Sequence, residues 1–175
     1  MTFLTEHKAK FENLINSLTQ KNKDQLRRKA NGGYSILFAY PPDQEKSYLE
    51  KLEEIKDEHD FAIINIAELL VKFIDNDGWE NFEILYKQFP SGPHVLFHSD
   101  DESIDLMDLI TQSISEADKM GKIPVLVRTG ALNGTGIENL NIMEHDSVMK
   151  NISNPLIVFY PSIIENNNLL YLNFK

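Results

Sequence analysis

The stretch from Val127 to Gly136, VRTGALNGTG, comes closer than any other in the chain to the spacing of a phosphate-binding loop. It follows a short apolar run and precedes a segment with a helical pattern, which is the usual context of a nucleotide-binding loop. A P-loop requires G-x-x-x-x-G-K-[ST], in which the lysine reaches the phosphate oxygens and the hydroxyl holds magnesium. Here Ile137 and Glu138 stand where the lysine and the hydroxyl belong. The dinucleotide pattern G-x-G-x-x-G is not met either.

Glu138 carries a second argument against phosphate. A carboxylate in the first turn of a helix takes the electrostatic position that a bound phosphate would occupy. The stretch therefore favours a turn that binds no nucleotide. Ligands of open α/β sheets nevertheless bind at the carboxyl ends of strands, so a weak anion or ligand site stays open as the alternative. Its candidate residues are Arg128, Thr129, Gly130, Gly134, Gly136 and His145.

Two further groups of residues could do chemistry. The run His98-Ser99-Asp100-Asp101 offers an imidazole and carboxylates, which are metal-ligand types. Ser99 and Glu102 also fit the S-x-x-E capping box at a helix start, which accounts for the same residues without a metal. His145, within IMEHDSVM on an amphipathic segment, is interpreted as a structural histidine. No residue is assigned a catalytic or metal-binding role, and no cofactor is expected.

The charge of the chain is unevenly distributed. The net charge is −10, but residues 1–33 hold seven Lys/Arg against three Asp/Glu, whereas residues 34–175 hold ten against twenty-four. An acidic body of this kind repels nucleic acid, so we expect weak or no direct DNA binding. The cluster Arg27-Arg28-Lys29 is interpreted as a solvated helix face, with contact to a phosphate or an acidic partner as the alternative.

Composition also limits the cellular setting. The chain has no cysteine, which excludes disulfides, thiolate metal sites and cysteine nucleophiles. The N-terminus lacks the layout of a signal peptide, and no run approaches the roughly 18 apolar residues that cross a bilayer. We therefore expect a cytoplasmic protein without membrane association. The last apolar run ends next to Lys175, which leaves room for a further C-terminal element beyond this sequence.

Short apolar runs predict the strands. They cover 34–40, 61–66, 124–128 and 155–160, with further candidates at 94–98 and 169–174. Pro41-Pro42 and Pro161 are expected to end two of these strands at one edge of the sheet.

Helical patterns lie between and before these runs. They cover 2–19, 21–30, 44–59 with Asp43 as its cap, Leu69 to Ile74, Trp79 to Phe89, the segment from Ser99 to Gly121, and 138–152. Unalternating strands separated by helices indicate an α/β fold, with a mainly parallel sheet flanked by helices in Rossmann-like or P-loop-like layers but without a Walker A motif. We expect a single domain over 1–175, with 1–33 as a helical N-terminal extension packed on it.

Four segments together resemble a known family. They are SILFAYPPDQEKSYLEKLEEI, FAIINIAELLVKFI, VLVRTGALNGTG and NPLIVFYPSIIENNNLLYLN, in this order between residues 34 and 174. Their order and spacing resemble the BrxB-like proteins of BREX phage-exclusion systems. The matching positions are Tyr40, Pro41, Asn65, Thr129, Gly130, His145 and Phe159 to Pro161. The family favours an arginine shortly before the histidine, where this chain has Met143 and Glu144.

The resemblance implies a role in antiviral defence and association with other BREX proteins, the alkaline-phosphatase-like PglZ component first among them. It supplies no catalytic residue. Two hypotheses therefore stand. The chain is a non-catalytic interaction module that helps assemble a defence complex, or it is a divergent nucleotide- or phosphate-binding α/β domain that uses the loop over 129–136.

Overall fold

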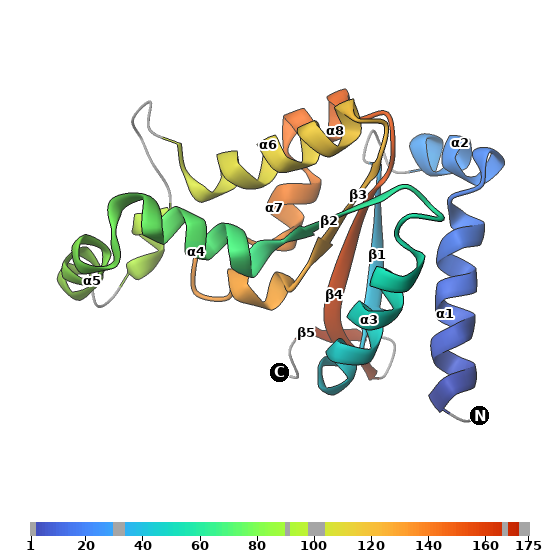
Figure 1. The fold of residues 1–175 in the computed structure, drawn as a ribbon, viewed down its shortest axis with the longest axis horizontal. Helices are drawn as coiled ribbons and strands as arrows, with labels where there is room; N and C mark the ends of the chain where they lie inside the picture. The colour runs from blue at the N-terminus through green and yellow to red at the C-terminus, as the bar shows by residue number, and fades with distance from the viewer. Residues whose placement is uncertain (1–2, 30–33, 90–91, 98–103, 166–167, 172–175) are drawn as a thin grey trace.

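The computed structural model describes residues 3–29, 34–89, 92–97, 104–165 and 168–171 (Figure 1). The helices are α1 (Phe3–Ser17), α2 (Gln20–Lys29), α3 (Glu45–Ile55), α4 (Ile66–Asp77), α5 (Trp79–Gln88), α6 (Leu106–Lys119), α7 (Asn139–Met143) and α8 (Asp146–Asn151). The strands are β1 (Ser35–Tyr40), β2 (Phe61–Asn65), β3 (Ile123–Val127), β4 (Leu156–Glu165) and β5 (Asn168–Tyr171). Short 3₁₀ turns add η1 (Pro42–Gln44), η2 (Pro93–Phe97) and η3 (Thr129–Leu132).

The sheet confirms the predicted α/β class. Its strand order is β1-β4-β3-β2, and all three neighbouring pairs are parallel. The four strands predicted at 34–40, 61–66, 124–128 and 155–160 are these four. β5, the strand predicted near the C-terminal end, pairs antiparallel with the second half of β4.

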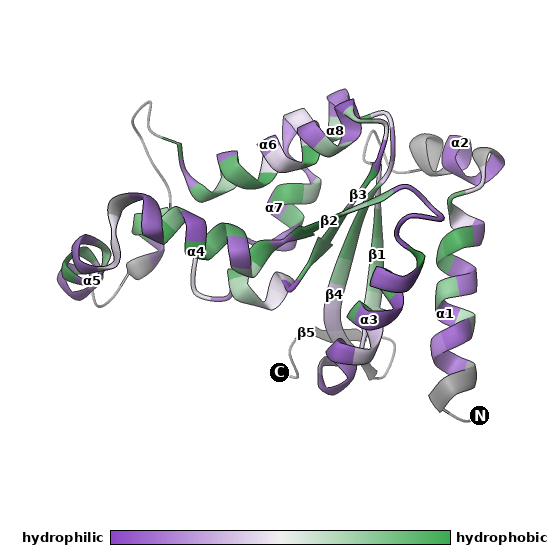
Figure 2. Ribbon diagram, viewed as in Figure 1, coloured by the Kyte–Doolittle hydropathy of each residue, from purple (hydrophilic) through white to green (hydrophobic). Residues whose placement is uncertain are grey.

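Helices cover both faces of the sheet, as Figure 1 shows. One face packs against α1 and α3, which contribute Phe11 and Tyr48 to a core with Val125 and Phe159. The other face packs against α6, α7 and α8, around a second core that includes Leu126. Because Val125 and Leu126 are neighbours in β3 yet belong to different cores, both faces of this strand are buried, and every residue of β3 is buried. Figure 2 shows the strands as apolar between more polar helices.

The N-terminal helix α1 packs on the sheet with its apolar side, as its 3.6-residue pattern predicts. Phe11 and Leu14 are 4% and 3% exposed. The Phe11 ring lies 5.1 Å from the Phe38 ring of β1 and 6.0 Å from the Tyr48 ring of α3, measured between centroids. α1 therefore contributes to the core on this face.

The predicted strand at 94–98 is wrong. The segment Pro93–Phe97 forms the 3₁₀ turn η2. This turn buries Phe97, whose ring lies 5.9 Å from that of Phe73 and 5.8 Å from that of Phe82, while Val95 stays 45% exposed. Packing of one aromatic side chain outweighs the β-propensity of the segment.

Two predicted element ends also differ. Pro161 does not end β4, which continues to Glu165 because Ser162 to Glu165 pair with β5 after β1 has ended. The helix predicted over 138–152 divides into α7 and α8, because His145 adopts an extended conformation and starts the second helix.

The predicted starts of two other helices shift as well. Asp43 lies within η1, and Gln44 stands at the N-cap of α3. α6 begins at Leu106 with Asp105 as its N-cap, and the Asp105 carboxylate accepts a hydrogen bond of 2.8 Å from the Asp108 amide. The run His98 to Asp101, the predicted capping pair Ser99 and Glu102, and the side chains of Arg27, Arg28 and Lys29 lie outside the described residues.

Candidate functional site

The loop that follows β3 is held in place by a sharp change of backbone direction and a buried hydrogen bond. Arg128 adopts a left-handed conformation (φ 55°, ψ 37°), which turns the chain into η3. The Thr129 hydroxyl is fully buried and donates a hydrogen bond of 2.8 Å to the carbonyl oxygen of Phe159 in β4. The start of the loop is thereby fixed to the neighbouring strand.

Much of the loop's backbone polarity is satisfied within the loop itself. The amide of Asn133 donates to the Gly130 carbonyl at 3.1 Å, and the amide of Thr135 donates to the Leu132 carbonyl at 3.0 Å. The buried Thr135 hydroxyl accepts from the Ile137 amide at 3.1 Å. These amides donate hydrogen bonds to acceptors within consecutive turns of the loop, whereas the amides of a P-loop donate to a bound phosphate.

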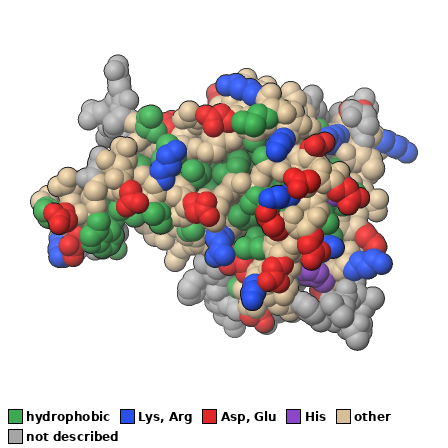
Figure 3. Space-filling view, viewed as in Figure 1, with side chains coloured by type: hydrophobic (Ala, Val, Ile, Leu, Met, Phe, Trp, Pro, Cys, Tyr) green, Lys and Arg blue, Asp and Glu red, His purple; other side chains and the backbone are tan. Residues whose placement is uncertain are grey.

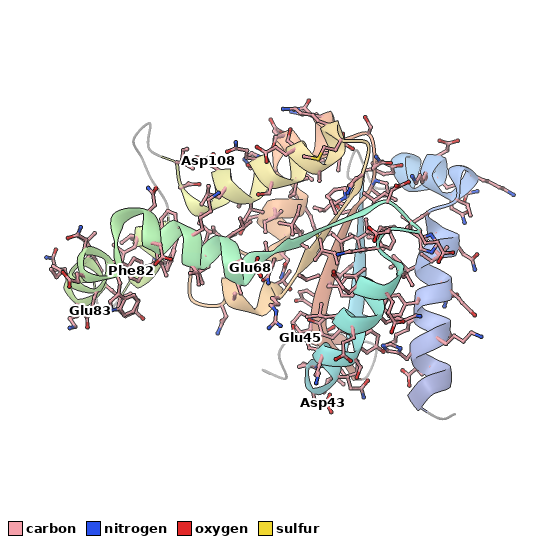
Figure 4. The ribbon with its side chains drawn as sticks, viewed as in Figure 1. Asp43, Glu45, Glu68, Phe82, Glu83 and Asp108 are labelled. Carbon is pink, nitrogen blue, oxygen red and sulfur yellow. The ribbon has the colours of Figure 1, made fainter. Side chains whose placement is uncertain are left out.

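Carboxylates stand at the starts of three helices that follow parallel strands. Glu45 lies in the first turn of α3, Glu68 in the first turn of α4, and Glu138 at the N-cap of α7. Figure 4 labels Glu45 at the start of α3 and Glu68 in the first turn of α4. A helix N-terminus favours negative charge. These carboxylates therefore already occupy the electrostatic positions that a bound phosphate would take.

Two of these carboxylates are held by neighbouring side chains. The Tyr40 hydroxyl donates to Glu45 Oε1 at 2.7 Å, and Arg128 Nη1 lies 3.9 Å from Glu45 Oε2. The Asn65 amide nitrogen donates to Glu68 Oε1 at 2.8 Å. The positive charge of Arg128 is therefore partly balanced by Glu45.

Two hollows border the loop. The smaller, which we call the edge hollow, has a volume of about 280 Å³ and is lined by Pro42, Glu45, Ala67, Arg128, Gly130 and Pro161 among others. The larger, which we call the loop pocket, has a volume of about 710 Å³ and lies between the segment 132–143, β1, β4 and η2.

The loop pocket has an apolar wall and a polar side. The apolar residues are Leu37, Leu132, Ile137, Leu140 and Met143. The polar side chains include His94, Glu138, Asn139 and Tyr160. Burial, and then the nearby Glu138 carboxylate, raise the pKa of Tyr160 above its ordinary value of 10.0. The Tyr160 hydroxyl therefore stays protonated and able to donate a hydrogen bond at neutral pH.

The structure distributes the predicted anion-site residues over separate places. Arg128 and Gly130 line the edge hollow, whereas Gly134 and Gly136 line the loop pocket. The Thr129 hydroxyl is engaged inside the protein. His145 caps α8, because its Nδ1 atom accepts from the Ser147 amide at 3.4 Å. This capping role agrees with the structural interpretation of His145, and the anion site stays a prediction.

Sequence reasoning missed most of the loop pocket. Leu37, Asn139 and Tyr160 come from segments far apart in the chain, and nothing in their local patterns marks them as neighbours. Among the polar residues that line the pocket, Glu138 is the one that the sequence singles out, because it stands at the Ser/Thr position of the P-loop pattern.

A separate apolar surface lies on the projecting pair of helices α4 and α5, which we call the α4–α5 arm. Five of the ten residues of α5 are Trp, Phe, Ile, Leu or Tyr, and none of its residues is buried. Trp79 is 60% exposed and Ile84 is 57% exposed. The rings of Trp79 and Tyr86 lie 6.1 and 6.0 Å from the ring of Phe82 between them. Figure 3 shows hydrophobic side chains at the surface of this arm, at the left of the view.

The described residues offer neither a metal-binding cluster nor a membrane-spanning helix. No group of three or more His, Asp or Glu side chains in the described part of the chain is placed to hold a metal ion. No described helix is both long and apolar enough to cross a membrane.

Comparisons with known proteins leave the family open. A scan against protein-family models finds no matching family, and no curated protein and no solved structure matches the chain significantly. The resemblance to the BrxB-like proteins therefore stays an expectation from the sequence motifs.

Proposed function

We propose that this protein is a non-catalytic assembly module of a BREX-type antiviral defence system, which binds other proteins through the α4–α5 arm. The observation that carries the proposal is the exposed apolar surface of α5. A helix that is apolar around much of its circumference is normally covered, yet Trp79, Ile84 and Tyr86 are between 47% and 60% exposed. Exposed apolar patches of this kind mark protein interaction sites.

The residue types on the arm suit a protein partner. Trp and Tyr are enriched among the residues that dominate binding energy at interfaces. Phe82 anchors the exposed Trp79 and Tyr86 rings, and its own ring packs on the buried Phe97 at 5.8 Å. A partner therefore meets aromatic side chains that are already positioned, which lowers the entropic cost of binding.

Charge indicates the kind of partner. Asp75 and Glu80 are exposed on the arm, and Glu83 is paired with Lys87 at 2.8 Å. An apolar surface with basic residues at its rim is complementary to this arrangement. The resemblance points to the PglZ component as the first partner to test. The acidic body of the chain also supports the expectation of weak direct binding to DNA.

The alternative function, a nucleotide- or phosphate-binding domain, is supported less well. Glu45, Glu68 and Glu138 place carboxylates at the helix starts where phosphate binds in such domains. Several loop amides that would hold a phosphate are engaged in turns.

The test is co-purification of the tagged protein with the PglZ protein of its own operon, for wild type and Trp79→Glu. We expect Trp79→Glu to weaken the complex about 30-fold, which corresponds to the loss of about 2 kcal/mol typical of an interface hot spot. The matched control is Met120→Glu, since Met120 is 72% exposed and lies outside the arm. Equal retention of PglZ by both variants, or no complex with the wild type, would contradict the proposal.

A further inference from the structure

The strand β1 forms one edge of the sheet. It pairs with β4 on one side, and no further strand of the described residues lies on its other side. An open edge presents a row of backbone N–H and C=O groups to which another chain can pair, and proteins usually protect such edges with charge, proline or a covering element. The six residues of β1, SILFAY, include no charged residue and no proline. This edge is therefore suited to pairing with another strand.

The hydrogen bonds to β4 identify the backbone groups that face the open edge. The Leu156 amide donates to the Tyr34 carbonyl at 2.9 Å, at the start of the parallel ladder between β1 and β4. In such a ladder, every second residue of β1 then directs its N–H and C=O groups toward β4. The residues between them direct these groups to the open edge. They are Ser35, Leu37 and Ala39.

The helix α1 protects one end of this row. Lys10 Nζ donates a hydrogen bond of 3.4 Å to the Ala39 carbonyl oxygen and lies 3.8 Å from Glu6 Oε1. A lysine beside an edge strand opposes unwanted pairing. A carbonyl oxygen accepts two hydrogen bonds, however, so Ala39 can keep Lys10 and still pair with another strand. Leu37, at the centre of the row, is 38% exposed, so the centre of the edge stays accessible.

The sequence of β1 is complementary to itself in the antiparallel direction. A two-fold axis at Leu37 places this residue opposite Leu37 of a second copy. Ser35 then lies opposite Ala39 of that copy. Ile36 lies opposite Phe38, which forms an apolar cross-strand pair of the kind that stabilises antiparallel strands. Because the outward residues face one another, each of their pairs exchanges two N–H···O bonds, and no like charges meet.

We propose that β1 pairs with β1 of a second copy of this chain, antiparallel about Leu37, so that the two sheets join into one. A two-fold dimer closes both β1 edges in a single contact. The uncharged, self-complementary strand favours a copy over a strand with charged residues, which would leave its charges without partners. Pairing also covers Leu37, which lines the loop pocket, so Leu37 of the second copy extends the apolar wall of that pocket.

This inference goes beyond the proposed function and does not depend on it. β1 and the α4–α5 arm are separate elements of the fold. Trp79→Glu, which tests the arm, should leave the dimer unchanged. Loss of the dimer should likewise leave the binding of PglZ through the arm in place, so that the two proposals fail separately.

The experiment measures the association of the full chain by sedimentation velocity over a series of concentrations. We expect a dissociation constant on the order of 10 µM for the wild type, because one strand pair is a small interface. Leu37→Lys and Leu37→Asp should each weaken the dimer at least about tenfold, since like charges then meet at the axis. An equimolar mixture of these two variants should restore it, since opposite charges then meet. The control is Met120→Lys, because Met120 is 72% exposed and lies outside β1.

Amide hydrogen exchange of the wild type gives a readout that needs no variant. The Leu37 amide should exchange more slowly as the concentration rises, whereas the Ile36 amide, which faces β4, should exchange slowly at every concentration. A wild type that stays monomeric, a dimer that survives in both charged variants, or equal weakening by Met120→Lys would overturn the proposal. So would a mixture that fails to restore the dimer. A dimer without slower exchange at Leu37 would place the contact elsewhere and would overturn it too.

Discussion

The hydrogen bond from Thr129 to Phe159 provides a sharp test of how the loop after β3 is held. The substitution Thr129→Val replaces the hydroxyl by a methyl group of nearly the same size. Thr129 is fully buried, and its Oγ1 atom lies 2.8 Å from the Phe159 carbonyl oxygen, 30 residues along the chain. The perturbation therefore removes one long-range bond and leaves packing almost unchanged.

The magnitude follows from the burial of both partners. Removing one partner of a buried hydrogen bond costs about 1–3 kcal/mol, because the other is left without its bond. For a chain of 175 residues, each kcal/mol lowers the midpoint of thermal unfolding by about 2–4 °C. We expect Thr129→Val to lower the midpoint by about 2–12 °C, measured by circular dichroism and by urea unfolding.

Thr111→Val is the matched control. Thr111 is also nearly buried, but its hydroxyl donates to the Met107 carbonyl at 3.0 Å within the same helix. That carbonyl keeps its helical partner when the hydroxyl is removed, so the loss should stay within about 0.5 kcal/mol. Equal losses of stability in Thr129→Val and Thr111→Val would refute the reasoning. The loss would then come from the burial of a threonine and not from the hydrogen bond between Thr129 and the Phe159 carbonyl of β4.

Two further predictions concern the helices. The pKa of His7 is lowered from 6.5, first by burial and then by Lys51, so the unfolded chain binds a proton that the folded chain resists. The free energy of unfolding should therefore fall as the pH drops through 6.5, and His7→Phe should remove this part of the pH dependence in urea titrations between pH 5 and 8; a wild-type slope retained in the variant would contradict it. Asp105→Ala should cost about 0.5–2 kcal/mol of stability because α6 loses its N-cap bond to Asp108, whereas Asp105→Asn should cost less. Equal losses in these two variants would show that the cap is unimportant.

The sheet was predictable because its strands are short apolar runs, and its two central strands, β3 and the first part of β4, are buried on both faces. Runs such as Ile123 to Val127 lack polar residues altogether, and this feature is visible without any knowledge of their neighbours. An apolar run alone does not predict the conformation of the segment 94–98, because that conformation depends on the packing of Phe97 on Phe73 and Phe82. The prediction that Pro161 ends β4 was wrong for a similar reason, because only the pairing of β4 with β5 shows that the strand continues.

The candidate site was predictable only in part. The departure from a P-loop at Glu138 is visible in the sequence, and the turns of the loop agree with it. The loop pocket could not be predicted, because it requires Leu37 of β1 and Tyr160 of β4 to adjoin the segment around Asn139. The strand order that brings β1 beside β4 is set by packing between segments more than 100 residues apart.

Glu138 is one of three carboxylates that stand at the starts of helices following the parallel strands, and together they change the electrostatics of this edge of the sheet. Helix starts after parallel strands attract anions, and here Glu45, Glu68 and Glu138 supply the anion from the chain itself. At physiological salt, charges beyond about 8 Å are largely screened, so these local carboxylates matter more to a small ligand than the net charge of −10. Helix starts after parallel strands bind phosphate in other proteins. In this protein the same positions present hydrogen-bond-accepting carboxylates. The start of α7 therefore offers a phosphate no favourable electrostatic position, because the Glu138 carboxylate already stands at its N-cap.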